Sequence, residues 1–173
     1  MRNLFFKALL AATLLSSASL TFAGTSPQTA SFAVTASVAN SCKITSTTAV
    51  AFAAYDPADV NFTTPLDNTG SVVLRCTKNT VATLALDQGV NATVGSTCAA
   101  PARQMASGTD RLGYGLYSNA VRTTAWGCSG NTVNSTSTGV ATPATLNVYG
   151  RVPQAQDVPA GAYADTVTVS VTF

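Results

Sequence analysis

The chain has 173 residues, of which 46% are hydrophobic and only 9% are charged, and it contains no His. Disorder would require few apolar residues and a high net charge, so this composition indicates a folded protein. The Lys and Arg residues are scattered singly, which excludes a basic nucleic-acid-binding surface. The absence of His excludes an imidazole general base.

Residues 1–23 are predicted to be a secretory signal peptide. Arg2 and Lys7 flank a basic start, an apolar run follows at residues 8–15, and small residues lead to a cleavage site after Ala23. The apolar run is too short to span a bilayer comfortably, and we expect no membrane span in the mature chain. Loss of Arg2 and Lys7 from nine basic residues leaves seven, against seven acidic ones.

Residues 31–39 have the alternating pattern of a half-buried strand. Its larger apolar positions share one face: Phe32, Val34, Ala36 and Val38. Two structures fit this pattern. The segment can be the first strand of the chain's own sandwich, which the pattern alone favours. It can also belong to a mobile arm, residues 24–40, that completes a neighbouring copy by strand addition.

Residues 41–173 are predicted to form one domain of short strands. We expect strands at residues 49–52, 71–76, 81–86, 112–117 and 145–152, a turn at 67–70, and long loops at 89–111 and 127–143. Many short strands punctuated by Gly, Pro and Asn are typical of an all-β sandwich or barrel.

Residues 163–173 form the clearest strand pattern. Val167, Val169, Val171 and Phe173 face one way, and Thr and Ser residues face the other. No Pro, Lys or charge occurs from Thr166 onward, so nothing in the strand itself protects its edge from pairing with another chain. We therefore expect another segment to cover this edge.

The four cysteines are Cys42, Cys76, Cys98 and Cys128. In an exported chain disulfides are the default state, and four cysteines allow three pairings. Zinc binding is disfavoured because no two of them have the close spacing of a ligand pair. We prefer Cys42–Cys76 and Cys98–Cys128, since the second bridge would tether the two predicted loops.

The sequence gives weaker support to two other function classes. An enzyme would have to use Asp carboxylates for its chemistry. Asp56 and Asp59 could form a carboxylate pair, but a turn explains them better. A carbohydrate-binding module would need a stacking face, for which the candidates are Tyr114, Tyr117, Trp126 and Tyr149. Such residues more often pack in a core.

Several short motifs occur in a specific order along the chain. They are Ser41-Cys42, Arg103-x-Met105, the Leu-Gly-Tyr-Gly-Leu-Tyr-Ser run at 112–118, Trp126-Gly127, Val148-Tyr149-Gly150-Arg151-Val152-Pro153, and Gly161-x-Tyr163-x-Asp165-Thr166 before the alternating tail. With them the mature chain resembles the spore coat protein U family, which includes subunits of archaic chaperone–usher pili. Cys128-Ser129-Gly130 departs from the pattern, where an Asp-Gly turn is expected.

The resemblance implies an all-β, incomplete immunoglobulin-like sandwich that is completed by donor-strand exchange between subunits. It also implies a periplasmic chaperone and an outer-membrane usher as partners, a place on the cell surface, and a role in adhesion and biofilm formation. The donor face would be Phe32, Val34, Ala36 and Val38. The acceptor groove would include Val167, Val169, Val171 and Phe173. A spore or cell-surface coat protein is the alternative, and neither role requires catalysis or a cofactor.

Overall fold

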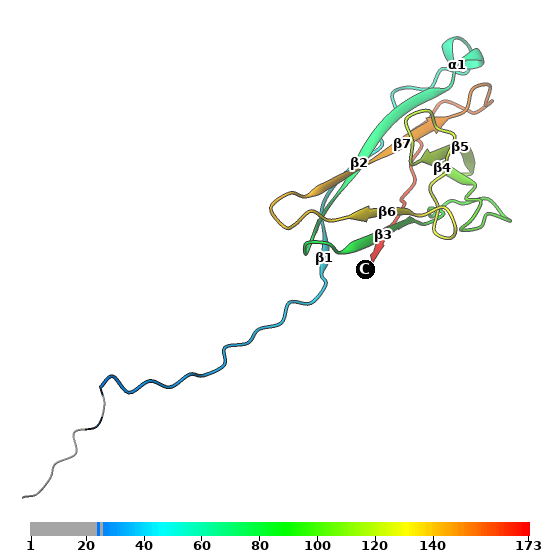
Figure 1. Ribbon diagram of the computed structural model, residues 1–173. Helices are drawn as coiled ribbons and strands as arrows, with labels where there is room; N and C mark the ends of the chain where they lie inside the picture. The colour runs from blue at the N-terminus through cyan, green and yellow to red at the C-terminus, as the bar shows by residue number, and fades with distance from the viewer. Residues whose placement is uncertain (1–23, 25) are drawn as a thin grey trace, which may run out of the picture. The chain divides into compact units, whose positions relative to one another are not determined.

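The computed structural model describes residues 24 and 26–173, so the predicted signal peptide lies outside the described residues. The chain divides into a leading unit that ends at Ala36 and a body, Ser37–Phe173. All of the described strands belong to the body (Figure 1). Among the described residues, no helix is long and apolar enough to cross a membrane.

The body is an all-β sandwich of two sheets, as predicted. Its elements are β1 (Cys42–Thr48), α1 (Val60–Thr63), β2 (Leu66–Cys76), β3 (Val81–Leu86), β4 (Arg103–Ser107), β5 (Asp110–Tyr117), β6 (Val133–Thr136), β7 (Ala144–Val152) and β8 (Val169–Thr172). One sheet has the strand order β1-β2-β7-β5-β4 and the other has the order β6-β3-β8. All pairings between these strands are antiparallel.

The core lies between the two sheets because one face of each strand is apolar. Leu74 of β2 and Val148 of β7 pack from the larger sheet, and Leu84 of β3 packs from the smaller one. Trp126, only 1% exposed, joins the same cluster, and its indole N–H donates to the carbonyl of Leu84 at 3.1 Å. Trp126 is therefore part of the core and is not available for stacking on a sugar.

Two disulfides join Cys42 to Cys76 and Cys98 to Cys128, the pairs preferred from the sequence. The first links the starting residue of β1 to the last residue of β2, which lie opposite each other in the sheet. The second links the loop before β4 to the loop before β6. Each bridge closes about 30 residues of chain, which favours folding by roughly 3–4 kcal/mol through the entropy of the unfolded state.

The turn predicted at residues 67–70 is wrong, because these residues lie inside β2. Gly70 has a different role there. A Cβ atom at this position would lie only 2.9 Å from a side-chain atom of Val50 and closer still to the backbone of Thr48. Glycine thus allows the segment after β1 to pass close over β2.

Four other strand assignments differ from the predictions. β4 and β6 lie inside the predicted loops 89–111 and 127–143. Their sequences, Arg-Gln-Met-Ala-Ser and Val-Asn-Ser-Thr, show no clear strand period, and neighbouring strands supply the pairing. Residues 49–52 form no strand, and only Val169–Thr172 of the predicted strand 163–173 is paired continuously, with β3.

Residues 31–39 form no strand either, although their pattern is that of one. Phe32, Val34 and Val38 are 84–86% exposed. An alternating sequence supplies side chains for one face of a sheet, but a strand also needs a partner for its backbone hydrogen bonds. The segment has the composition of a strand, but the described part of the chain supplies no such partner for it.

Candidate functional site

An apolar groove runs along the body between two segments that are far apart in the sequence. It consists of two adjoining hollows of about 710 and 440 Å³. Residues 47–55, which include the end of β1, form one wall, and residues 158–169, which lead into β8, form the other. Val50, Phe52, Met105 and Asp165 line both hollows, so the two are continuous.

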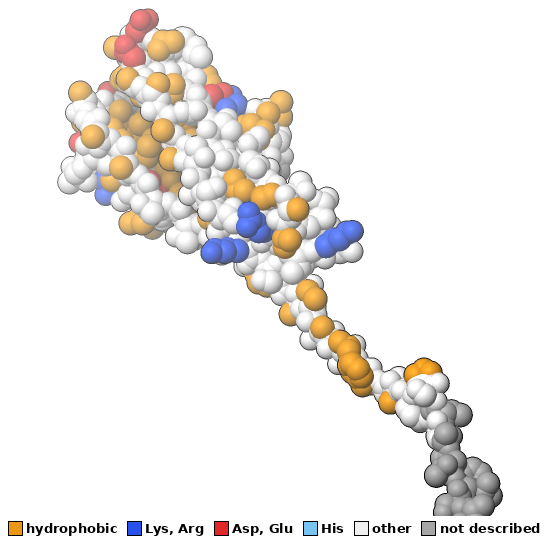
Figure 2. All heavy atoms as spheres, turned by 90° about the vertical axis from the view of Figure 1, so that its left-hand side faces the viewer, with side chains coloured by type: hydrophobic (Ala, Val, Ile, Leu, Met, Phe, Trp, Pro, Cys, Tyr) orange, Lys and Arg blue, Asp and Glu red, His pale blue; other side chains and the backbone are white. Residues whose placement is uncertain are grey.

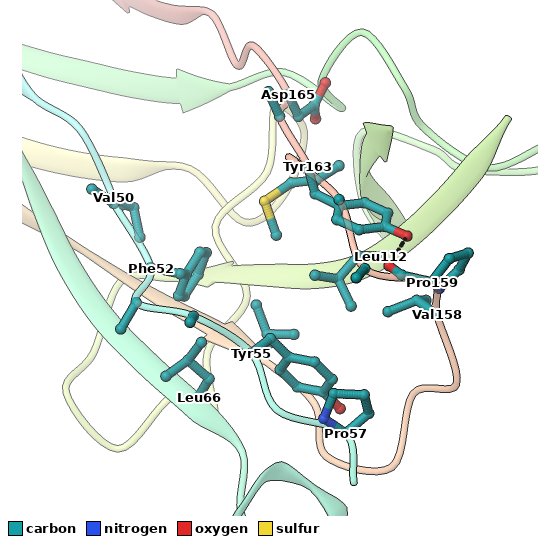
Figure 3. A pocket seen from close by; sticks show the side chains of 18 residues that line it. Val50, Phe52, Tyr55, Pro57, Leu66, Leu112, Val158, Pro159, Tyr163 and Asp165 are labelled. Atoms are coloured by element: carbon teal, nitrogen blue, oxygen red, sulfur yellow. Dashed lines mark hydrogen bonds between the residues drawn. The ribbon is translucent and has the colours of Figure 1, made fainter. Parts of the chain in front are cut away.

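The first hollow is lined mainly by apolar and aromatic side chains that point toward one another (Figure 3). Phe52 and Tyr55 come from the first wall, Tyr163 comes from the second, and Leu112 of β5 lies between them. The Tyr163 hydroxyl donates to the carbonyl of Pro159 at 2.9 Å, which closes the turn of the second wall.

The second hollow reaches the hydrophobic core. Its floor includes Val72, Leu86, Leu116 and Val148, all of which belong to the core cluster. In a finished sandwich such side chains would be covered by a strand of one of the sheets. The second hollow therefore exposes core side chains that an extended apolar segment could cover.

The strands that flank the groove each have an unpaired edge. β1 is the edge strand of the five-stranded sheet, and β8 is the edge strand of the three-stranded sheet. Within the described part of the chain, β8 is paired only with β3, through Val169–Thr172. Its other edge carries backbone N–H and C=O groups that a further strand could use.

Asp165 holds the second wall of the groove in place. One carboxylate oxygen accepts hydrogen bonds from the backbone N–H groups of Val90 and Asn91, at 3.0 and 3.1 Å, and from the Asn91 side chain. The other oxygen accepts a hydrogen bond from the Tyr114 hydroxyl at 2.6 Å. The carboxylate thus ties the approach to β8 to the loop after β3 and to β5.

Asp87 makes a second attachment to the wall, at Thr168, three residues after Asp165. One of its carboxylate oxygens accepts the N–H groups of Gly89 and Thr168, each at 2.9 Å. Burial alone would raise the pKa of Asp87, but these backbone hydrogen bonds outweigh it, and the pKa lies below its usual range. The ionised carboxylate is therefore the form that holds the wall.

Arg103 fixes the backbone at Leu86 and Asp87, where the second attachment begins. It is 2% exposed, and its guanidinium donates to the carbonyls of Leu86, Asp87 and Trp126. Because a buried charge is costly unless it is hydrogen-bonded, this arrangement fixes the end of β3 relative to Trp126. Arg103 therefore has a structural role.

The residues predicted to form the acceptor groove lie in three environments. Val167 and Val169 line the second hollow. Val171 packs against the core cluster without lining either hollow, and Phe173 is 53% exposed. The four predicted donor residues, Phe32, Val34, Ala36 and Val38, are all exposed and lie outside any strand.

The first wall is the part of the site that the sequence analysis missed. Val50 and Phe52 were expected to be a short strand and instead line the groove as irregular chain. Phe52 packs edge-on against Tyr114, with ring centroids 6.4 Å apart. The apolar alternation of residues 50 and 52 was a signal for this wall, but it did not reveal the hollow beside it.

Asp56 and Asp59, the carboxylates considered for an enzyme, lie in a turn before α1. Asp56 accepts the N–H groups of Ala58 and Asp59, the hydrogen bonds of an Asx turn. Among the residues that the structure describes, no three His, Cys, Asp or Glu side chains are grouped closely enough to hold a metal ion.

Comparison with known proteins shows which family and which solved structures the chain resembles. The family model described as Spore Coat Protein U domain matches residues 28–170. "Protein U" of Myxococcus xanthus is 41% identical over 126 residues, which cover 70% of each chain. A chain in the crystal structure of the CsuC–CsuE chaperone–tip adhesion subunit pre-assembly complex, from the archaic chaperone–usher Csu pili of Acinetobacter baumannii, is 25% identical with a TM-score of 0.50. The match covers 79% of the present chain and 40% of that chain.

We expect the buried Tyr114 hydroxyl, which donates to Asp165, to make the free energy of unfolding depend on pH in the alkaline range. Burial, followed by the interaction with Asp165, raises the pKa of Tyr114 above its ordinary value near 10. Above about pH 10 the unfolded chain ionises this hydroxyl and the folded chain does not, so the free energy of unfolding should fall as the pH rises.

Urea unfolding of the mature protein between pH 8 and pH 11 or so measures this effect, since the range brackets the ordinary Tyr pKa. Tyr114→Phe should lose less stability over the interval than the unmodified chain. Equal slopes for the two proteins would show that Tyr114 does not couple folding to pH.

Proposed function

Because this chain belongs to the Spore Coat Protein U domain family, we propose that it is a structural subunit of a chaperone–usher surface pilus. In this proposal subunits polymerise by donor-strand complementation, in which an extended segment of one copy fills the groove of the next. Residues 1–23 direct export, residues 24–40 form the donor arm, and residues 41–173 form the accepting sandwich.

One observation carries the proposal. The body has an apolar groove beside the unpaired edge of β8, and the same chain has an exposed segment with the apolar alternation of a strand. Phe32, Val34, Ala36 and Val38 of one copy would enter the groove of another. Val167 and Val169 would contact them, and Val171 and Phe173 would extend the accepting strand.

The energetics suit a long-lived joint. Burial of each large apolar side chain of the donor face contributes roughly 1.5–3 kcal/mol. The backbone of the arm would also satisfy the exposed edge of β8, and the acceptor would complete its core only when the arm is seated. Dissociation would then expose the core, so the joint should be stable kinetically as well as thermodynamically.

The proposed partners follow from the relatives. The structural match is to a subunit complex that contains a chaperone, which supports a periplasmic chaperone and other pilus subunits as partners. An outer-membrane usher, a place in a surface fimbrium, and a role in adhesion and biofilm formation complete the proposal. The family and the fold point to a structural protein, not an enzyme.

A coat protein is the second candidate. The description of the family model names a spore coat protein, which favours this role for some members. Such a protein would use the same sandwich and the same strand exchange, and it would assemble on a spore or cell surface.

Deletion of residues 24–40 tests the donor role. The truncated protein should form no polymer, because no arm remains to enter a groove. It should still bind a synthetic peptide that spans residues 29–41, and light scattering with a peptide-binding titration measures both properties. Polymer formation undiminished by the deletion would refute the donor role.

Ala36→Trp tests the predicted donor face. Ala36 is the smallest of the four side chains, so a Trp there should be too large for its place in the groove. Polymerisation should slow by roughly ten-fold or more, which corresponds to about 1.4 kcal/mol in the free-energy barrier. Ser37→Trp is the matched control, since residue 37 would face away from the groove. Equal rates for the two variants would place residue 36 outside the groove.

A further inference from the structure

Three basic side chains gather at one end of the body. Lys43 of β1 and Arg75 of β2 lie directly opposite each other in the sheet, and both are exposed. Lys78 lies in the turn after β2, and a hydrogen bond from the Thr77 N–H to the carbonyl of Ser41 holds this turn beside the start of β1. Like charges placed opposite each other in a sheet are destabilising, so the arrangement is costly in an isolated subunit.

Three acidic side chains gather at the other end. Asp56 and Asp59 lie just before α1, and Asp157 follows a loop that packs on this segment. The Ala155 N–H donates to the carbonyl of Asn61 at 2.8 Å, and the Gln156 N–H donates to the Tyr55 hydroxyl at 2.9 Å. All three carboxylates are exposed.

The two groups are separated by the length of β2. This strand begins at Leu66, just after α1, and ends at Cys76, beside the basic group. Its 11 residues span roughly 35 Å. Figure 2 shows basic side chains at one end of the body and acidic side chains at the opposite end.

The other four basic and four acidic residues of the body are equal in number. Arg122 and Arg151 both form ion pairs with Asp67, at 3.3 and 2.7 Å, and within the described residues these are the only ion pairs. Arg103, Asp87 and Asp165 belong to the hydrogen-bonded supports of the groove wall. Arg111 adjoins Asp110 at the start of β5. The three basic side chains at one end and the three acidic side chains at the other therefore remain, and their formal charges are equal and opposite.

We propose that the basic end, Lys43, Arg75 and Lys78, docks on the acidic end, Asp56, Asp59 and Asp157, of the next copy of this chain. The inference rests on the proposed function, because it takes the neighbour to be another subunit. The basic end surrounds the point at which the arm joins β1. The acidic end adjoins the first hollow, which is lined by Tyr55, Pro57, Val158 and Pro159.

The docking also selects a direction for the arm. β3 leads away from the basic end and β8 is antiparallel to it, so residues 158–172 run from the acidic end toward the basic end. An arm that runs antiparallel to residues 158–172 brings its own basic end to the acidic end of the acceptor. An arm inserted the other way would bring two basic ends together, which opposes assembly.

Charge reversal in the full mature chain tests this contact. Lys43→Glu/Lys78→Glu and Asp59→Lys/Asp157→Lys should each slow fibre elongation by about ten-fold or more at low salt. The difference should shrink at about 1 M salt, where the screening length falls to about 3 Å. In the chain with all four substitutions, Arg75 and two Glu give one end a formal charge of −1, and Asp56 and two Lys give the other end +1. These ends attract each other again, but less than the original ends of +3 and −3, so the rate should recover part of what each charge-reversed chain loses.

Matched controls separate this contact from general effects of charge and folding. Arg111→Glu makes the same charge change as Lys78→Glu but lies on the β4–β5 hairpin, so it should leave elongation unchanged. Binding of the free peptide 29–41 should be the same in all variants, because the peptide lacks the basic end.

The possible outcomes differ for the two proposals. The docking contact alone would be overturned if both charge-reversed chains bound the peptide and elongated normally. It would also be overturned if the fourfold-substituted chain were as slow as the two charge-reversed chains. Failure of the original chain to elongate or to bind the peptide would count against the proposed function. Loss of binding to vesicles of anionic lipid on Lys43→Glu/Lys78→Glu, with elongation unchanged, would assign the basic end to a lipid surface and also overturn the proposal.

Discussion

The unpaired edge of β8 is the feature on which the proposed assembly depends. β8 is hydrogen-bonded to β3 along one side, and on its other side a groove leads down to core residues of both sheets. A strand edge beside an apolar groove attracts any extended apolar segment, and native proteins normally cover such edges. In the proposed fibre, the arm of the neighbouring subunit pairs with this edge, and that pairing forms the joint between subunits.

In the proposed assembly the groove accepts a strand, and hydrogen bonds within the body fix its walls. Asp165 and Asp87 bind the approach to β8 through backbone amides, and buried Arg103 holds the end of β3 that receives them. On the other side, Gly70 and Gly150 allow residues 48–52 to lie close over β2 and β7. A preformed groove lowers the ordering cost of binding, leaving mainly the arm to be ordered.

Sequence patterns predicted the sandwich and the alternation of residues 163–173, since both depend on local periodicity. The preferred cysteine pairing came from the two predicted loops that it would tether, because spacing alone leaves three pairings open. Sequence patterns failed where tertiary contacts decide the structure. Gly70 reads as a turn residue, yet it serves a close approach between segments. β4 and β6 are polar strands whose pairing comes from their neighbours. Val50 and Phe52 have the pattern of a strand but line a groove, because their partner is not supplied by the described part of the chain.

Amide hydrogen exchange of residues 31–39, measured in the mature monomer and in the assembled fibre, tests the central proposal most directly. We predict fast exchange in the monomer, where these residues form no strand, and strong protection in the fibre, together with new protection along the free edge of β8. Protection of residues 31–39 already in the monomer would show that the chain completes its own sandwich. Fast exchange of the same residues in the fibre would show that they are not the segment that joins one subunit to the next.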